Sequence, residues 1–193
     1  MARIAFIVAK DFEDSEFRVP YEQVKQAGHE AVIVGVEAGK PLEGKKGKET
    51  LSAEKRVRDV SAADFDALVI PGGYSPDHLR MDIQMVGFVR DFFKADKPIA
   101  AICHAPWMLV EADIADGRTV TSFPSIKTDL INAGARWVDR EVVEDGNLIT
   151  SRKPDDLKAF CAALLRQVSQ GIAPRLTSPL APEAASDPSP AVH

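Results

Sequence analysis

The chain has 193 residues, 27% of them charged, and a formal net charge of -5 at pH 7. This length suits one well-buried domain, and a mildly acidic chain without a run of Lys or Arg has no electrostatic footprint for nucleic acid. No apolar stretch approaches the ~20 residues of a membrane-spanning helix. The densest basic cluster, Lys45, Lys46 and Lys48, lies in a glycine-rich stretch that we interpret as a solvated loop. We therefore expect neither a nucleic-acid partner nor a membrane partner.

Cysteine content and the N-terminus indicate the compartment. The two cysteines, Cys103 and Cys161, are too few for a disulfide framework and fit a reducing environment. Met1 runs directly into an apolar strand pattern that is too short for the apolar region of a signal peptide. These features predict a cytoplasmic protein.

The first half of the chain alternates apolar runs with amphipathic segments. This alternation predicts β-α-β units, which require right-handed crossovers and a parallel sheet. Between residues 37 and 61 the chain is polar, with short β segments expected near Thr50 and Val57. The other predicted elements are strand Arg3–Ala9, helix Ser15–Ala27, strand Glu30–Val36, strand Phe65–Ile70, short helix Ser75–Arg80 and helix Ile83–Ala95.

The second half continues the pattern and ends in a change of composition. Its predicted elements are strand Ile99–Ile102, a helix to Ala112, strand Thr119–Ser122, helix Ser125–Ala133, strands Trp137–Val138, Glu141–Val143 and Asn147–Thr150, and helix Pro154–Gln170. Pro, Ala and Ser then dominate, so we predict one domain over residues 1–170 and a disordered tail over 171–193. The predicted fold class is α/β, a flavodoxin-like doubly wound sandwich with a mainly parallel central sheet. In such folds, ligand-binding and catalytic sites lie at the carboxyl ends of the strands.

Cys103 occupies the most informative position in the chain. It directly follows the apolar run Ile99–Ile102, and Pro106 suits the first turn of a helix. A cysteine on a sharp strand-to-helix turn has the geometry of a nucleophile elbow. The positive field of a helix N-terminus favours thiolate over thiol, so we expect a lowered pKa for Cys103. Cys161, on the apolar face of a helix, is expected to be core filler.

Three loops are expected to meet around this thiol. They carry Glu13, Asp14 and Glu16; Gly72, Gly73 and Asp77; and the elbow with His104. His104 is the candidate base or cationic partner, Glu16 can exchange a proton with the thiol, and the N–H groups of Gly73 and His104 are candidate oxyanion donors. Adjacent residues tend to point apart, however, so His104 can reach the sulfur only through an unusual turn. Its orienting carboxylate must come from another segment.

Each of these residues also has a purely structural interpretation. His104 can simply cap a helix, Glu16 suits a helix N-terminus, and Asp77 after Pro76 is an ordinary turn or capping residue. No His or Cys pair has metal-ligand spacing, and no G-x-G-x-x-G follows a strand. We therefore expect no metal and no nucleotide cofactor.

Four motifs together carry a family resemblance. Ala101–Pro106, Pro71–Gly73, Phe12–Glu16 and Trp137–Asp139 resemble the PfpI-type intracellular proteases of the DJ-1/PfpI superfamily, and the resemblance extends from Arg3 to Val168. It implies a flavodoxin-like fold, a cysteine at the elbow and a site glutamate that matches Glu16. It also implies that an acidic residue matching Asp77 reaches His104 from a neighbouring subunit, which predicts a homodimer or a larger homo-oligomer.

The resemblance implies a cysteine-dependent stress-response hydrolase, although the activities described for the family differ. The substrate is either a small reactive carbonyl compound or its glycated adduct, as in glyoxalases and deglycases, or a peptide. Expected substrate-binding residues, besides Gly72 and Gly73, are Tyr74, Ala105 and Trp107. The alternative is an oxidative-stress sensor or chaperone in which Cys103 is oxidised. Three positions depart from the family pattern: Asp77 replaces Glu, Ala105 replaces Gly and Phe123 replaces Tyr.

Overall fold

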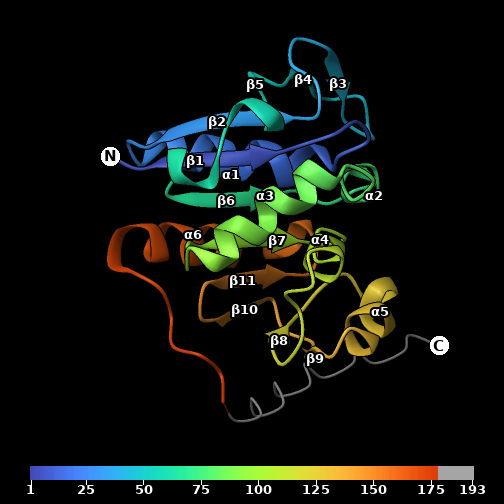
Figure 1. The fold of residues 1–193 in the computed structure, drawn as a ribbon, viewed down its shortest axis with the longest axis vertical. Coiled ribbons are helices and arrows are strands. Elements are labelled where there is room, and N and C mark those ends of the chain that lie inside the picture. Colours follow the sequence, from blue (N-terminus) through green and yellow to red (C-terminus); the bar gives the residue numbers. More distant parts are fainter. Residues whose placement is uncertain (178–193) are drawn as a thin grey trace, which may run out of the picture.

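A computed structural model describes residues 1–177 and has a central seven-stranded sheet in the order β10-β11-β7-β6-β1-β2-β5 (Figure 1). Neighbouring strands are parallel except β10 and β11, which form an antiparallel hairpin. The strands of this sheet are β1 (Arg3–Ile7), β2 (Glu30–Gly35), β5 (Lys55–Arg56), β6 (Ala67–Ile70), β7 (Ile99–Ile102), β10 (Val142–Asp145) and β11 (Leu148–Ser151). The predicted fold class is confirmed.

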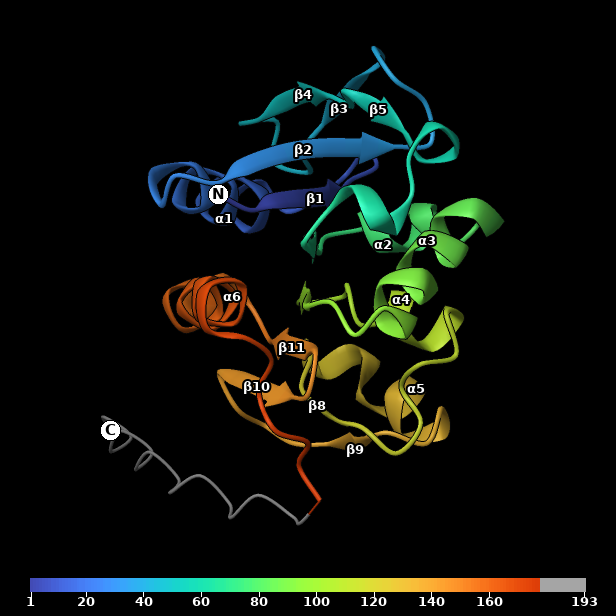
Figure 2. The ribbon, with the colours of Figure 1, turned by 60° about the vertical axis from the view of Figure 1, so that its left-hand side comes forward.

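Helices cover both faces of the sheet (Figure 2). The helices α1 (Asp14–Gln26) and α6 (Leu157–Gln170) lie on one face, and α2 (Ser75–Leu79), α3 (Ile83–Lys94) and α4 (Trp107–Glu111) lie on the other. The remaining elements are helix α5 (Lys127–Asn132), strands β3 (Pro41–Glu43) and β4 (Thr50–Ser52), which pair with each other, and strands β8 (Thr119–Val120) and β9 (Arg136–Trp137), which form a second small sheet. No helix in the described part of the chain is long and apolar enough to cross a bilayer.

Two hydrophobic clusters lie on opposite faces of the sheet, and successive residues of a central strand belong to one cluster and the other in turn. In β1, Ile4 and Phe6 belong to the cluster under α1 and α6, whereas Ala5 and Ile7 belong to the cluster under α3 and α4. Successive side chains of a strand point to opposite faces, so a strand covered on both sides needs apolar residues at every position. This burial is why the parallel strands appear in the sequence as continuous apolar runs.

The predicted strands and helices match these elements closely, with one difference near the site. In the polar segment 37–61, the β segment expected near Thr50 is β4, and the one expected near Val57 is β5, which ends one residue earlier, at Arg56. The helix expected directly after Cys103 starts only at Trp107, because residues 103–106 form tight turns first. In these turns the N–H of Ala105 donates to the carbonyl of Ile102, at 3.0 Å.

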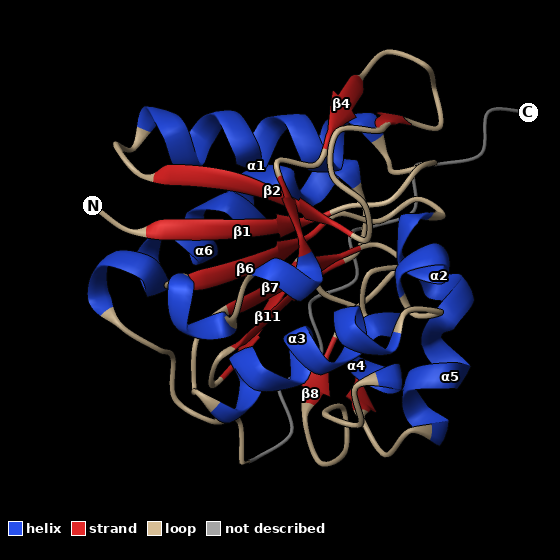
Figure 3. Ribbon diagram, turned by 45° about the horizontal axis from the view of Figure 1, so that its top comes forward, coloured by secondary structure: helices blue, strands red, loops and turns tan. Residues whose placement is uncertain are grey.

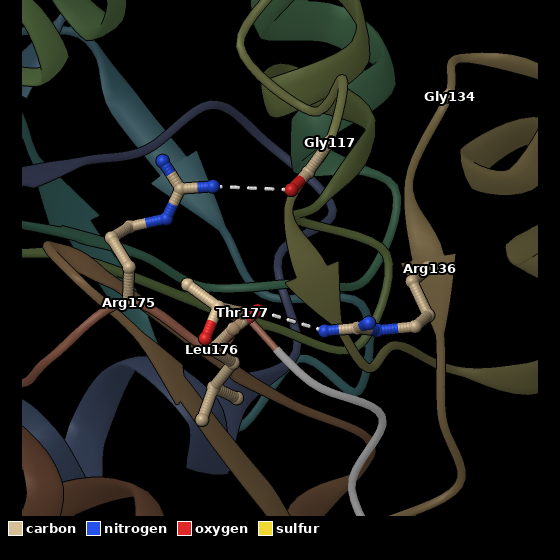
Figure 4. A pocket seen from close by; sticks show the side chains of 6 residues that line it. All are labelled: Gly117, Gly134, Arg136, Arg175, Leu176 and Thr177. Atoms are coloured by element: carbon tan, nitrogen blue, oxygen red, sulfur yellow. Dashed lines mark hydrogen bonds between the residues drawn. The ribbon is translucent and has the colours of Figure 1, made fainter.

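The start of the predicted tail is attached to the domain. The buried carboxylate of Asp145 accepts hydrogen bonds from the N–H of Leu176 (2.8 Å) and Nε of Arg175 (2.9 Å). Arg136 donates to the carbonyl of Leu176 at 2.8 Å, and Arg175 donates to that of Gly117 at 3.1 Å (Figure 4). Residues 174–177 are therefore held against the β8–β9 sheet, in contrast to the prediction. The rest of the predicted tail, 178–193, lies outside the described residues.

The parallel strands end at one common edge of the sheet. The arrowheads of β1, β6 and β7 point the same way in Figure 3. The loops after these strands lead into α1, α2 and α4. Parallel α/β sheets bind ligands at this edge, where loops from neighbouring strands meet.

Candidate active site

Cys103 adopts a backbone conformation that is rare for a residue with a side chain. Its φ is 65°, in the left-handed region, where an L side chain is strained. Two hydrogen bonds fix this turn: the N–H of Cys103 donates to Ser151 of β11 (3.0 Å), and its carbonyl accepts from Phe123 (2.9 Å). The chain thus reverses immediately after β7, as the elbow prediction requires.

This strained turn brings His104 to the sulfur. Sγ of Cys103 lies 3.1 Å from Nδ1 of His104, so the two adjacent side chains meet and do not diverge. The other ring nitrogen, Nε2, lies 3.0 Å from Oγ of Ser125. Phe123 stacks on the imidazole with ring centroids 5.0 Å apart, and Trp107 makes a T-shaped contact with it at 5.3 Å. Both nitrogens of His104 are therefore engaged within the chain.

The glycine pair after β6 allows close approach to the thiol. A Cβ on Gly72 would lie 2.6 Å from Cβ of Cys103 and 2.6 Å from Oε2 of Glu16. Gly73 has a φ of 74°, and a Cβ there would lie 2.5 Å from backbone atoms of the loop after β1. The N–H groups of Gly73 and His104 are directed at the sulfur of Cys103. The two predicted oxyanion donors therefore converge on the thiol.

Glu16 lies completely buried in the first turn of α1. Its Oε2 accepts the N–H of Gly72 at 2.9 Å, and its side chain faces Cys103. Its other oxygen, Oε1, is buried without a hydrogen-bond partner in the described part of the chain. Burial and the neighbouring charge of Glu13 raise the pKa of Glu16 to about 8. The carboxyl group is therefore mostly protonated at neutral pH and can donate a proton beside the sulfur.

The expected low pKa of Cys103 is wrong for this chain. Burial and the nearby Glu16 carboxylate raise the pKa of Cys103 to about 12, against the smaller opposing effect of the Gly73 and His104 N–H groups. Helix α4 starts four residues later and spans only Trp107–Glu111, so the expected helix field is displaced from the sulfur. Burial and the charge of Lys45 lower the pKa of His104. A neutral imidazole thus faces a neutral thiol.

The other predicted site residues lie at different depths. Tyr74, 65% exposed, directly precedes α2, and Asp77 is an exposed residue within it. No hydrogen bond or ion pair within the described chain joins Asp77 to His104. Trp107 flanks His104 and donates from Nε1 to Asp129 at 2.8 Å. Ala105 is fully buried in the core cluster, so its methyl group lines no open surface. Cys161 is buried in the core under α6, as expected.

The sequence did not identify two contributors to the site. Ser125 was expected only as the start of a helix, and its bond to His104 spans 21 positions. Lys45 was assigned to a solvated loop, but its Nζ lies 2.7 Å from Oε2 of the buried Glu13. An acidic pair at the start of a helix, Glu13 and Asp14, was the available signal, because carboxylates that become buried need hydrogen-bond donors.

The described residues contain no group of His, Cys, Asp and Glu side chains arranged to hold a metal ion. The groups that meet at this edge of the sheet are a thiol, a neutral imidazole, a protonated carboxyl group and converging backbone N–H groups. These groups suit nucleophilic attack by sulfur followed by proton transfer.

Comparisons with known proteins show the family of the chain. The model of the DJ-1/PfpI family matches residues 2–167. Protein/nucleic acid deglycase 2 of Escherichia coli strain K12 is 47% identical over 165 residues, which cover 85% of this chain and 96% of that protein. YraA of Bacillus subtilis strain 168, named as a candidate cysteine protease, is 47% identical over 158 residues, covering 82% and 93%. The crystal structure of Drosophila melanogaster DJ-1beta matches with a TM-score of 0.81 at 29% identity, covering 88% of this chain and 91% of that chain.

Proposed function

The chain belongs to the DJ-1/PfpI family, and we propose that it is an enzyme in which Cys103 attacks small reactive carbonyl compounds or their adducts on larger molecules. The similarity to a deglycase supports this class of substrate. The single observation that carries the proposal is the 3.1 Å contact between Sγ of Cys103 and Nδ1 of a neutral His104.

His104 activates the thiol in the first step. With its proton on Nε2 donated to Ser125, the ring offers the lone pair of Nδ1 to the S–H group. Nδ1 takes the thiol proton as sulfur forms a bond to the carbonyl carbon, and the C=O π electrons move to oxygen. The N–H groups of Gly73 and His104 stabilise the resulting oxyanion. This base compensates for the raised pKa of Cys103, since thiolate forms only as it reacts.

Glu16 supplies the later proton transfers. With a 2-oxoaldehyde such as methylglyoxal, the hydrogen on the attacked carbon leaves as a proton, and Glu16 returns a proton to the neighbouring carbonyl carbon. Water then cleaves the thioester, so methylglyoxal and one water give lactate without an external oxidant. A carboxyl group with a pKa of about 8 can both donate and accept protons near neutral pH.

Limited access to the thiol favours small substrates over peptides. Cys103 is only 5% exposed, and the rings of Phe123 and Trp107 contact its partner His104.

We further propose that the protein forms a homodimer or larger homo-oligomer, in which Asp77 of a neighbouring copy places a carboxylate near His104. Light scattering after size-exclusion chromatography measures the oligomeric state. A monomer with undiminished activity would refute a role for Asp77 across a subunit interface.

The enzyme proposal is tested by following methylglyoxal and lactate with purified protein. We expect wild-type protein and Cys161→Ala to produce lactate and Cys103→Ala to produce none. Cys161 lies in the core, so its variant controls for the loss of a thiol elsewhere. Equal lactate production by Cys103→Ala and wild type would refute the role of this sulfur.

One observation favours a second candidate function, a peroxide sensor. The N–H groups of Gly73 and His104 and the protonated Glu16 surround the sulfur with donors that an oxidised, anionic sulfur needs. Peroxide titration followed by intact mass tests this function. Stoichiometric oxygen addition at Cys103 supports it, and unmodified protein at a small peroxide excess refutes it.

A further inference from the structure

Residues 121–125, which follow β8, make three contacts with the reactive pair. The N–H of Phe123 donates to the carbonyl of Cys103 at 2.9 Å. The ring of Phe123 stacks on the imidazole of His104, with centroids 5.0 Å apart and planes inclined by 23°. Oγ of Ser125 lies 3.0 Å from Nε2 of the same imidazole. The position of His104 beside the sulfur therefore depends on where this segment lies.

The segment has little secondary structure of its own to hold it. Strand β8 has only two residues, and residues 123–125 are exposed. Pro124 restricts Phe123 to an extended conformation, with φ −56° and ψ 135°, but this restriction is local. The first attachment to the rest of the domain is the buried Thr121, whose N–H donates to Oγ1 of Thr150 at 2.9 Å.

Trp137 provides the second attachment. It lies in β9, beside the parallel strand β8 (Figure 1), and is paired with Val120 at the end of that strand. Its indole extends past this end, and Nε1 donates to Oγ of Ser122 at 2.9 Å. The completely buried hydroxyl of Ser122 in turn donates to the carbonyl of Phe123 at 2.9 Å. A chain of hydrogen bonds thus leads from the indole N–H to the residue that stacks on the catalytic candidate.

We propose that Trp137 is a positioning residue for the candidate site, and that its indole N–H holds Phe123 against His104 through the hydroxyl of Ser122. A buried hydroxyl that loses its donor favours a local rearrangement in which it finds another partner. Such a rearrangement would loosen the stack on the imidazole. The proposal gives a role to the motif Trp137–Asp139. The effect on turnover rests on the proposed function, whereas the position of the imidazole can be observed directly.

Proton NMR of the imidazole measures this position without turnover. A stacked aromatic ring shields the carbon-bound protons of its neighbour, so loss of the Phe123 stack moves the His104 signals downfield. The chain has four histidines, and the signals that are absent from His104→Gln belong to His104. Phe123→Leu supplies the signal positions of an unstacked imidazole. The titratable neighbours of the ring, Cys103 and Lys45, are unchanged in all the other variants.

Trp137→Phe removes the indole N–H and keeps an aromatic ring. We expect its His104 signals to move toward those of Phe123→Leu. Burial holds the pKa of His104 below 6.5, so an imidazole released toward water should also titrate closer to that value. If the proposed function holds, kcat should fall about threefold to tenfold with little change in KM.

Two further variants separate the hydrogen bond from the packing of the ring. Ser122→Ala removes the acceptor and should displace the same signals. The double variant with Trp137→Phe should show no larger effect than either change alone, because both act through one bond. Lys127→Met is the matched control, since Nζ of Lys127 lies over the face of the Trp137 ring, 4.9 Å from its centroid, and not at its N–H group. This control should keep the wild-type signals.

Each outcome decides for or against the role of Trp137. Unchanged His104 signals in a folded Trp137→Phe would refute it, whatever the result for lactate. Additive effects of Trp137→Phe and Ser122→Ala, or an equal displacement in Lys127→Met, would also refute it. If thermal melting shows that Trp137→Phe does not fold, Ser122→Ala decides, and unchanged signals there refute the role. Displaced signals together with no lactate from wild type would support the positioning role and refute the proposed enzyme.

Discussion

The sulfur of Cys103 lies 3.1 Å from Nδ1 of His104, the residue that follows it in the chain. Neighbouring side chains meet in this way because Cys103 has a φ of 65°, which turns the backbone sharply after β7. The strain of this turn is held by hydrogen bonds to β11 and to the segment after β8. The candidate site therefore depends on the surrounding sheet for its geometry.

Ser125→Ala should slow turnover without affecting binding. Its Oγ lies 3.0 Å from Nε2 of His104 and holds the tautomer whose Nδ1 can take the thiol proton. We expect kcat to fall about threefold to tenfold with little change in KM. Ser169→Ala, on the exposed side of α6, is the control and should match wild type. An unchanged kcat in Ser125→Ala would show that this hydroxyl does not orient the base.

Glu16→Gln should change how stability depends on pH. The pKa of Glu16 is raised in the folded chain from 4.5 to about 8, so the folded state holds a proton that the unfolded state loses. The stability from this proton is complete below the unfolded value and is lost as pH rises toward about 8. We therefore expect wild type to lose about 2–4 kcal/mol relative to Glu16→Gln across this window. Denaturant unfolding at several pH values measures the free energy of unfolding of both proteins. The same pH dependence in wild type and Glu16→Gln would contradict this prediction.

Gly72→Ala should disable the site, whereas Gly87→Ala should not. The added Cβ at Gly72 would lie 2.6 Å from both Cys103 and Glu16. Overpacking of this kind costs about 1–3 kcal/mol and should displace the thiol. Gly87, within α3, has no atom within 4 Å of an added Cβ, so Gly87→Ala should stabilise the helix by about 0.5–1 kcal/mol. Thermal melting and lactate production test both, and an active, fully stable Gly72→Ala would contradict this packing.

Arg175→Ala should weaken the attachment of residues 174–177 to the domain and leave the candidate active site unchanged. Arg175 bonds to the buried Asp145 and to the carbonyl of Gly117 (Figure 4), but it is half exposed, so we expect a loss of only about 1 kcal/mol. Hydrogen exchange in residues 174–177 should increase while alkylation of Cys103 keeps its wild-type rate. Lys158→Ala, on the exposed side of α6, provides the control. Unchanged exchange would mean that other contacts hold this segment.

The fold was largely predictable, because strands buried on both faces have apolar residues throughout. The run Ile99–Ile102 fixes both the position of β7 and the elbow at Cys103. Gly72 and Gly73 were also recognisable, since only glycine tolerates the close approach that the loop requires. These features depend on residues that are neighbours in the sequence, and such local patterns can be recognised from the sequence alone.

Long-range contacts account for what could not be predicted. Ser125 reaches His104, and Asp14 anchors residues 46–49, across loops that no local pattern connects. The pKa of Cys103 depends on burial and on Glu16, neither of which is visible from its position before a helix. Arg175 lies in a stretch with the composition of a tail, yet Asp145, which it contacts, is fully buried.

The most direct test of the account is the rate of Cys103 alkylation by iodoacetamide as a function of pH, in wild type and His104→Gln. If neutral His104 takes the thiol proton, wild type reacts at neutral pH, with an inflection below the ordinary histidine pKa of 6.5. His104→Gln should then react at least about tenfold more slowly at neutral pH. A rate that is negligible near neutrality and rises only toward the thiol pKa of about 12, equally in both proteins, would contradict the account.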